Sequence, residues 1–318
     1  MMLVHKQEFQ GAEQSPVNVA AVIVTYNPDP VAFENVVAAV RAQVARVVIV
    51  DNRSTGPTAV ALQTLAIRYD CTFVALERNV GIAAAQNRGV DAVLSSSGWR
   101  ATSGEHYVLF LDHDSIASDD MVQHLLDSDL RLRNQGVAVG AVGPVIIDAR
   151  TGSTGRFIRW RRGWLTREAC QSECDEFEVA FMISSGTMVR LDVLGRIGMM
   201  NEWLFVDHVD TEWCLRAAAA RYRLFAACRA RLTHALGDEV IRVWLGRWRE
   251  VFVHSPLRDY YMCRNTLFLL KKTRMPLAWR SFLWMRMFGS IVFFGFLVPP
   301  RRARLRDMAR GVFDGMRQ

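Results

Sequence analysis

Short apolar runs and helically patterned stretches alternate along the first third of the chain. The apolar runs are rich in β-branched residues, which is typical of strands buried on both faces. They predict strands over residues 19–24, 46–50, 72–76 and 107–111. The stretches between them predict helices over residues 31–44, 57–69 and 81–94. Strands that alternate with helices of this length indicate βαβ units and a mostly parallel sheet, hence an α/β fold.

The pattern is less regular further along the chain. It predicts strands over 137–142, 180–189 and 222–227, and a loop that enters a helix over 204–220. The segment 148–178 is charged and rich in Gly, Arg and Trp, so we expect a mobile loop there.

Apolar helices with basic flanks are predicted near the end of the chain, over 259–272 and 281–297. Residues 281–298 are about long enough to span a bilayer. Arg286 lies in their middle, however, and a central arginine costs roughly 2.5–3.5 kcal/mol on insertion. We therefore expect a helix that lies in the membrane interface, and an ordinary apolar helix packed on the domain is the alternative.

The balance of charged residues also changes near residue 240. The chain carries a net charge of +7, yet residues 1–240 are mildly acidic. Residues 241–318 hold 16 Lys and Arg but only 4 Asp and Glu. Such a tail indicates contact with an anionic surface, either a membrane or a nucleic acid.

The six cysteines are scattered, and the first sixteen residues contain no apolar run of signal-peptide length. We therefore expect reduced thiols in a cytosolic protein. A zinc site begun by Cys170 and Cys174 is disfavoured, because no second Cys/His pair follows at zinc-finger spacing.

Polar residues follow the predicted strands at their carboxyl ends, where ligands bind in parallel sheets. The most informative are Asp112 and Asp114, because two carboxylates two residues apart can share a hard divalent cation such as Mg²⁺ or Mn²⁺. No G-x-G-x-x-G follows the first strand, and the chain has no G-x-x-x-x-G-K-[ST]. A Rossmann dehydrogenase and a P-loop NTPase are therefore disfavoured.

Four further features allow a functional and a purely structural interpretation. Asp51 suits a hydrogen bond to a base or ribose, or a turn. The cluster around Gly81 suits a close backbone approach to a ligand, or a plain helix start. The acidic run 207–212 suits a general base with a raised pKa, or a helix N-terminus. His234 suits a structural histidine, or a contact to a metal or diphosphate.

Seven motifs in order resemble the family 2 glycosyltransferases, and most closely their bacterial rhamnosyltransferase-like branch. The motifs are V-I-V-T-Y-N-P, V-V-I-V-D-N-R-S, N-V-G-I-A-A-A-Q-N-R-G, L-F-L-D-H-D-S, S-S-G-T-M-V-R, F-V-D-H-V-D-T-E-W-C-L-R and H-A-L-G. The resemblance runs from about residue 19 to 237 and weakly on through 260–270. It implies a GT-A fold with a Rossmann-like nucleotide-binding half and an acceptor half, an inverting mechanism and a nucleotide-diphosphate sugar donor.

The resemblance also implies roles for individual residues. Asp210 matches the catalytic base, and the D-x-D pair Asp112 and Asp114, with His234, matches the site for ribose, metal and diphosphate. The other implied contacts to nucleotide, donor or acceptor are Thr25, Tyr26, Asn27, Asp51, Arg78, Asn79, Gly81, Asn87, Ser185, Gly186 and Arg216. One departure concerns the base, since Val209 stands where the family commonly has Glu. Asp207 and Asp210 fit the D-x-x-D spacing of the branch, which leaves Asp207 as a competing base.

Together these observations predict three parts: a lead-in over 1–17, a glycosyltransferase domain over 18–240 and a membrane-associating helical region over 241–318. Within the domain, 18–115 is the nucleotide-sugar half and 116–240 the acceptor half. The expected partners are a dTDP- or UDP-sugar, a saccharide or lipid-linked saccharide acceptor and the anionic inner face of the cell membrane, where the protein is peripheral and cytoplasmic.

Two other functions stay open on the residues alone. A sugar-nucleotide pyrophosphorylase also uses a parallel sheet and a metal, but it needs a Gly-rich phosphate loop near the first strand. Nucleic-acid binding by the basic tail is the other, because aromatic residues lie between its charges. A continuous apolar face fits lipid or protein core better, so no nucleic acid is expected.

Overall fold

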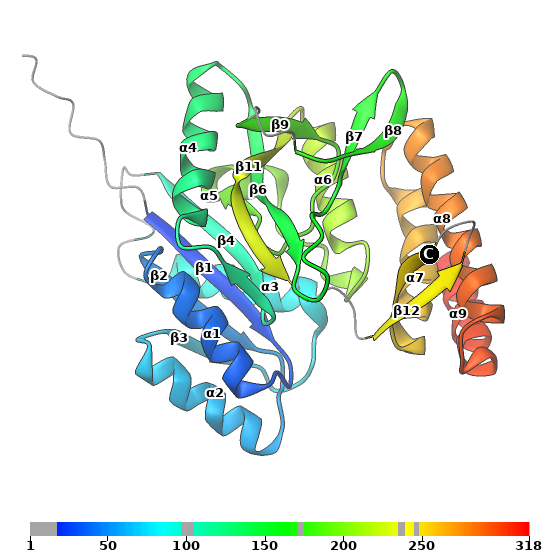
Figure 1. Cartoon of the computed structure of the whole chain (residues 1–318), viewed down its shortest axis with the longest axis horizontal. Coiled ribbons are helices and arrows are strands. Elements are labelled where there is room, and N and C mark those ends of the chain that lie inside the picture. The colour runs from blue at the N-terminus through cyan, green and yellow to red at the C-terminus, as the bar shows by residue number, and fades with distance from the viewer. Residues whose placement is uncertain are drawn as a thin grey trace, which may run out of the picture.

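The computed structural model describes residues 18–96, 99, 105–170, 175–234, 239–244 and 248–317. The predicted lead-in over 1–17 and Cys174 lie outside these residues. A mixed sheet with the strand order β3-β2-β1-β4-β10-β6-β11-β5 forms the centre of the described chain, and β9 pairs with β11 (Figure 1). Its strands are β1 (Asn18–Thr25), β2 (Arg46–Asp51), β3 (Thr72–Ala75), β4 (His106–Asp112), β5 (Ser115–Ala117), β6 (Val139–Asp148), β9 (Glu176–Val179), β10 (Met188–Arg190) and β11 (Arg223–His234).

Helices cover both faces of this sheet. On one face lie α1 (Pro30–Arg41), α2 (Gly56–Arg68) and α4 (Met121–Asn134). On the other face lie α3 (Gly81–Ser95), α5 (Leu191–Ile197) and α6 (Val209–Ala219). Each layer has its own apolar core, because the strands of the sheet are apolar on both sides.

The first half of the fold follows the sequence pattern closely. The strands β1 to β4 are parallel to one another, as predicted. Helix α1 begins where the sequence indicates, because the Asp29 side chain accepts a hydrogen bond of 2.8 Å from the Ala32 N–H and Pro30 occupies the first turn.

Two predictions for the second half are wrong. The segment 148–178 is no mobile loop: it contains the hairpin of β7 (Phe157–Arg161) and β8 (Trp164–Glu168) and the start of β9. The ion pair of Arg159 with Glu168 at 2.7 Å joins the two strands of the hairpin. The predicted strand 180–189 is extended only in β10, because the preceding residues turn at Gly186, whose φ is +82°.

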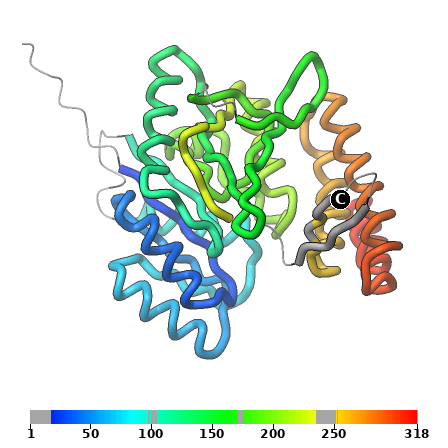
Figure 2. Tube along the Cα trace, in the orientation of Figure 1, coloured from blue at the N-terminus to red at the C-terminus, as the bar shows by residue number. Residues whose placement is uncertain are grey.

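The end of the chain forms a helical layer beside the β7–β8 hairpin (Figures 1 and 2). It contains α7 (Pro256–Lys272), α8 (Leu277–Phe296) and α9 (Arg301–Arg317), preceded by the hairpin of β12 (Glu239–Trp244) and β13 (Trp248–Val253). Buried residues of all three helices belong to the same apolar cluster as α3 and α6. In the described residues, no helix combines the length and the apolar character that crossing a bilayer requires.

Helix α9 was missed in the sequence because its apolar residues are interrupted by arginines and glycines. The glycines are what let it pack. A Cβ on Gly311 would overlap the Tyr260 backbone, and one on Gly315 would crowd Arg264 of α7. Arg304 is buried and pairs with Asp259 of α7, while the Tyr260 hydroxyl donates to Asp314 at 2.9 Å. These contacts join α7 and α9 into one unit.

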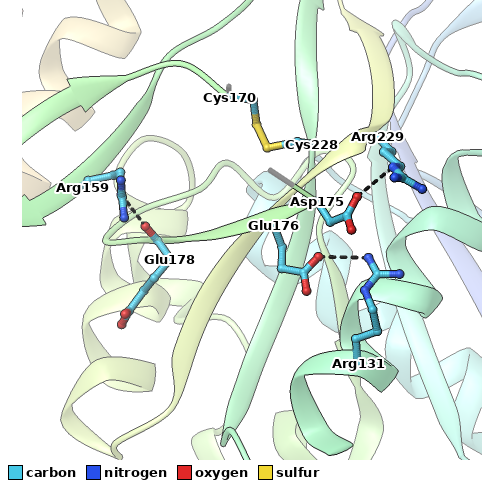
Figure 3. The surroundings of a disulfide bond; sticks show 8 residues. All are labelled: Arg131, Arg159, Cys170, Asp175, Glu176, Glu178, Cys228 and Arg229. Atoms are coloured by element: carbon cyan, nitrogen blue, oxygen red, sulfur yellow. Dashed lines mark hydrogen bonds and ion pairs between the residues drawn. A yellow bond between two sulfur atoms is a disulfide. The ribbon is translucent and has the colours of Figure 1, made fainter. Parts of the chain in front are cut away.

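A disulfide joins Cys170 to Cys228, so the expectation of reduced thiols is wrong for this pair (Figure 3). Their Cα atoms are 5.6 Å apart, within the range that a disulfide spans. Sequence spacing gave no sign of the pair, because 58 positions separate the two residues and only the pairing of β9 with β11 brings them together. Cys71, Cys214 and Cys263 are free thiols, as expected.

Candidate active site

Two strands end at the same edge of the sheet and bring three potential metal ligands together. Asp112 ends β4, Asp114 follows it closely, and His234 ends β11. The antiparallel pairing of β11 with β5 sets His234 opposite Ser115. One ligand atom from each of the three residues lies within 4.8 Å of the others. The structure thus unites the residues that the sequence predicted as metal ligands.

Two serine hydroxyls hold this group in place through hydrogen bonds. The Ser115 hydroxyl lies 2.8 Å from Nδ1 of His234 and 2.7 Å from the Ser185 hydroxyl. The Ser185 hydroxyl in turn accepts a hydrogen bond from the Asp112 N–H at 3.1 Å. Ser185, predicted to lie near the donor and acceptor sugars, is buried here and orients Asp112. Ser115 was not singled out in the sequence, although it directly follows the D-x-D pair.

The charges of the group act on one another. Burial raises the pKa of Asp112, and the neighbouring charge of Asp114 adds to the rise while His234 opposes it. Burial would also raise the pKa of Asp114, but the hydrogen bond and charge of His234, 3.2 Å away, lower it overall. The carboxylates conversely raise the pKa of His234 against the effect of its burial. The three groups thus interact electrostatically at close range, and two carboxylates and an imidazole are groups that can ligate a divalent cation.

Asp210 lies in the first turn of α6 and lines a small pocket with Ser184 and Met200. Burial raises its pKa to about 7, the charge of Asp112 adds to the rise, and hydrogen bonds from Ser184 oppose it. A carboxylate with a pKa near neutrality is poised to take a proton at physiological pH. The acidic run thus contains the raised pKa that the sequence suggested.

Asp207, the competing base, is held differently. Both of its carboxylate oxygens accept hydrogen bonds from the guanidinium of Arg258 in α7, at 2.7 and 3.2 Å. A bidentate pair of this kind occupies the lone pairs that a base would use. Asp210 is therefore the better placed base. Arg258 had no signal in the sequence beyond the weak resemblance of the segment that follows it.

His208 anchors the start of α6 between these two aspartates. Its backbone is left-handed, with φ at +63°, and its side chain is buried. Nε2 lies 2.9 Å from the Thr266 hydroxyl of α7. Burial lowers the pKa of His208 to about 4, so the imidazole is neutral at pH 7. It ties the start of α6 to the C-terminal helices.

The predicted nucleotide residues cluster at the ends of β1 and β2. The Asn27 side-chain oxygen accepts a hydrogen bond of 2.9 Å from the Thr55 N–H, and both Asp51 oxygens accept from the Ser54 N–H. Asp51 is buried and Tyr26 is about half exposed. The hydroxyl of Thr25 is buried and has no hydrogen-bond partner among the described residues. An unpartnered buried hydroxyl beside a carboxylate is a feature that a bound polar ligand would satisfy.

Around Gly81 the backbone is folded tightly. Its φ is +83°, and a Cβ there would overlap the Phe205 carbonyl oxygen. The Asn79 side chain accepts from the Gly81 N–H at 3.0 Å and from the Asn52 side chain at 3.1 Å. Gly81 is therefore required for contact with the segment before α6. Arg78, next to this turn, is exposed.

Three other residues implied by the resemblance serve the fold in this structure. Asn87 is buried and bonds the Met200 backbone with both ends of its amide, at 2.9 and 3.0 Å. Arg216 donates to the carbonyls of Ile197 and Met199 at 2.7 Å. Gly186 has no room for a Cβ beside Pro144. Asn87 and Arg216 thus both hydrogen-bond the backbone of the segment that contains Met200, a residue that lines the Asp210 pocket.

Known proteins agree with this geometry. The family model "Glycosyl transferase family 2" matches residues 20–198. The dTDP-rhamnosyl transferase RfbF of Shigella flexneri is 32% identical over 261 residues, which are 82% of this chain and 82% of that protein. The chain therefore belongs to glycosyl transferase family 2 and is a glycosyltransferase.

Solved structures of low sequence identity share the fold. The crystal structure of GalNAc-T7 with UDP, GalNAc and Mn²⁺ matches with a TM-score of 0.56 at 12% identity, over 91% of this chain and 60% of that chain. The structure of S. aureus TarS 1–349 in complex with UDP-GlcNAc has a TM-score of 0.56 at 14% identity, over 94% and 81% of the two chains. The predicted GT-A fold is thereby confirmed.

Proposed function

We propose that the protein is an inverting glycosyltransferase that moves L-rhamnose from dTDP-rhamnose to a hydroxyl of a saccharide or lipid-linked saccharide acceptor, in cell-surface polysaccharide synthesis. The observation that carries the inverting part is Asp210, a single carboxylate with a pKa of about 7 beside the Asp112–Asp114–His234 cluster. The donor assignment is supported by the likeness to the Shigella rhamnosyl transferase.

In this proposal Asp210 takes the proton from the acceptor hydroxyl while that oxygen attacks the anomeric carbon. The nucleoside diphosphate leaves from the opposite face of the sugar, so one displacement inverts the configuration. Ser184 orients Asp210, while burial and, after it, the charge of Asp112 keep the pKa of Asp210 high enough for it to accept a proton. No side-chain nucleophile is required.

The cluster also fits a divalent cation. Two carboxylates suit Mg²⁺ or Mn²⁺, an imidazole completes the set, and the serine hydroxyls behind them fix their orientation. Asp112, Asp114 and His234 would hold the ion. When bound, it would supply positive charge that stabilises the leaving diphosphate.

Ligand-induced stabilisation tests the donor class and the cation together. We expect the unfolding temperature of the full chain to rise with dTDP-rhamnose plus Mn²⁺, because a ligand that binds only the folded state stabilises it. UDP- and GDP-sugars serve as comparisons, each with Mn²⁺ and with a chelator. Stabilisation by a GDP-sugar alone would contradict the donor assignment, and equal stabilisation in the chelator would contradict the role of the cation.

The pH dependence follows from the state of Asp210. The carboxyl must be deprotonated to act as a base, so kcat/KM should fall about tenfold per pH unit below pH 7 and level off above it. The measurement is an initial-rate profile from pH 5 to 9, with the unfolding temperature followed over the same range to exclude loss of fold. A profile that is flat between pH 5 and 8 would argue against Asp210.

A peripheral membrane location at the cytoplasmic face is part of the proposal. Helix α8 exposes a strip of large apolar side chains four positions apart, Trp284, Phe288, Val292 and Phe296. The exposed arginines Arg301 and Arg302 follow at the start of α9. An apolar strip next to basic residues fits the interface of an anionic bilayer.

The double substitution Trp284→Ser and Phe288→Ser should weaken binding to anionic vesicles at least tenfold, since each large apolar side chain contributes about 1.5–3 kcal/mol when fully buried. Vesicle co-sedimentation measures this. The matched control, Val60→Ser with Ile67→Ser, removes two exposed apolar side chains from α2 and should change nothing. Equal binding by both double variants would refute the membrane contact. Point changes are preferable to truncation, because α9 packs on α7.

A further inference from the structure

A cavity of about 1070 Å³ lies between the β7–β8 hairpin and the C-terminal helices. Arg156 and Arg167, before and within the hairpin, line one side, and Arg258 of α7 and Arg286 of α8 line the other. The cavity is large enough for a ligand of several rings or a long chain. None of the predicted donor or metal residues apart from Asp207 lines it.

Three of the four arginines that line the cavity have no carboxylate partner among the described residues. In the described parts of the chain, Arg156, Arg167 and Arg286 form no ion pair with a carboxylate. The aspartates of the lining are already engaged. Asp207 pairs with Arg258 and Asp259 with Arg304.

Asp148, the third lining aspartate, accepts hydrogen bonds from the N–H groups of Arg150 and Thr151 at 2.9 Å. Three arginines thus line a shared space, each without an ion pair to a carboxylate in the part of the chain that the structure describes.

Of the three arginines, Arg286 gives the strongest indication of an anion site. Arg286 is exposed to the solvent of the cavity, yet the surrounding chain desolvates its guanidinium enough to lower its pKa. The charge of Asp207 raises this pKa, and the charges of Arg167 and Arg258 lower it. A guanidinium in this position gains from an added anion, and the fork geometry of arginine suits phosphate oxygens. Arg286, which made a membrane-spanning helix unfavourable in the sequence analysis, therefore lines a cavity of the folded chain.

Apolar side chains of α8 line the cavity beside these arginines. Phe282, Met285 and Phe294 of α8 line it, and Met285 is also one of the exposed large apolar residues of the helix. The cavity wall is in this way continuous with the exposed apolar strip of α8. An amphipathic ligand would find both cationic and apolar contacts in this cavity.

The cavity also adjoins the reaction centre. Met182 and Ile183 line both the cavity and the pocket of Asp210. Burial raises the pKa of Asp112 in the D-x-D pair, and the charge of Arg258, which lines the cavity, is one of those that oppose this rise. A ligand in the cavity can therefore extend toward the base.

We propose that this cavity is the acceptor site, and that it takes an acceptor whose sugar is attached to an apolar chain through a phosphate or diphosphate. Arg286, with Arg156 and Arg167, binds the phosphate oxygens, and the α8 wall takes the apolar chain. The inference rests on the proposed glycosyltransferase reaction and specifies its acceptor.

Titration calorimetry on the full chain tests this acceptor assignment by measuring the affinity for geranyl diphosphate. A chelator is present, so that no cation at the aspartate cluster can bind the diphosphate. Inorganic diphosphate and octyl glucoside separate the contributions of charge and chain. We expect geranyl diphosphate to bind at least tenfold more tightly than either. Arg286→Gln should weaken its binding at least tenfold, and Arg167→Gln should also weaken it. Arg280→Gln, on the same helix but outside the cavity lining, should bind as the parent does.

Two results would overturn the proposal: equal binding of geranyl diphosphate by the parent and by Arg286→Gln, or equal binding of inorganic diphosphate and geranyl diphosphate. Failure here is distinguishable from failure of the proposed function. Stabilisation by dTDP-rhamnose and Mn²⁺ does not involve Arg286, so it should persist in Arg286→Gln. If it persists while geranyl diphosphate does not bind the parent, only the acceptor assignment fails.

Discussion

Asp210→Asn should lower kcat by about 10²–10⁴ while donor binding is retained, because that is the usual contribution of a general base. The amide keeps the shape of the carboxylate but cannot accept the acceptor proton. Steady-state kinetics give kcat, and the shift in unfolding temperature with donor and Mn²⁺ reports donor binding. Near-normal turnover would remove Asp210 from the role.

Asp207→Asn is the informative comparison. Its carboxylate is bonded by Arg258 at both oxygens, so its loss should affect acceptor KM and stability more than kcat. If Asp207→Asn abolished turnover with donor binding intact while Asp210→Asn did not, the assignments would have to be exchanged.

Asp114→Ala should reduce Mn²⁺-supported turnover by about 10²-fold or more, because a bound cation contributes several kcal/mol to stabilising the leaving group. The substitution removes one of three clustered ligand atoms and also the partner that lies 3.2 Å from His234. The measurements are the Mn²⁺ concentration for half-maximal activity and kcat at saturation.

Asp119→Ala is the matched control for that variant. Asp119 is an exposed aspartate five positions further on, so it should respond to Mn²⁺ as the parent does. Unchanged Mn²⁺ dependence in Asp114→Ala would show that the D-x-D pair does not hold the cation.

The first half of the fold was predictable because its signals are local. Apolar runs of β-branched residues gave β1, β2 and β4, and the Asp29-Pro30 pair gave the start of α1. The order of the polar strand ends then placed the D-x-D pair at one edge of the sheet. The residues alone left His234 either a structural histidine or a contact to a metal or diphosphate, because its approach to the pair depends on the pairing of β11 with β5.

What sequence reasoning missed depends on contacts between distant segments. The β7–β8 hairpin has too many charged and aromatic residues for an alternating strand pattern, and an ion pair and the contact with α8 stabilise it. Arg258 and Arg304 looked like part of a basic tail, yet both pair with aspartates. Net charge does not distinguish an arginine that binds a lipid from one that holds two helices together.

The disulfide bond has a practical consequence for preparing this enzyme. Cys170 comes just after the hairpin that carries Arg167, and Cys228 lies in the strand that ends at His234 (Figure 3). Material expressed in an oxidising host would therefore have the segment after the β7–β8 hairpin cross-linked to the strand that carries His234, whereas material from a reducing host would not. Kinetic constants from two such preparations describe two covalent species and become comparable only after their redox state has been matched.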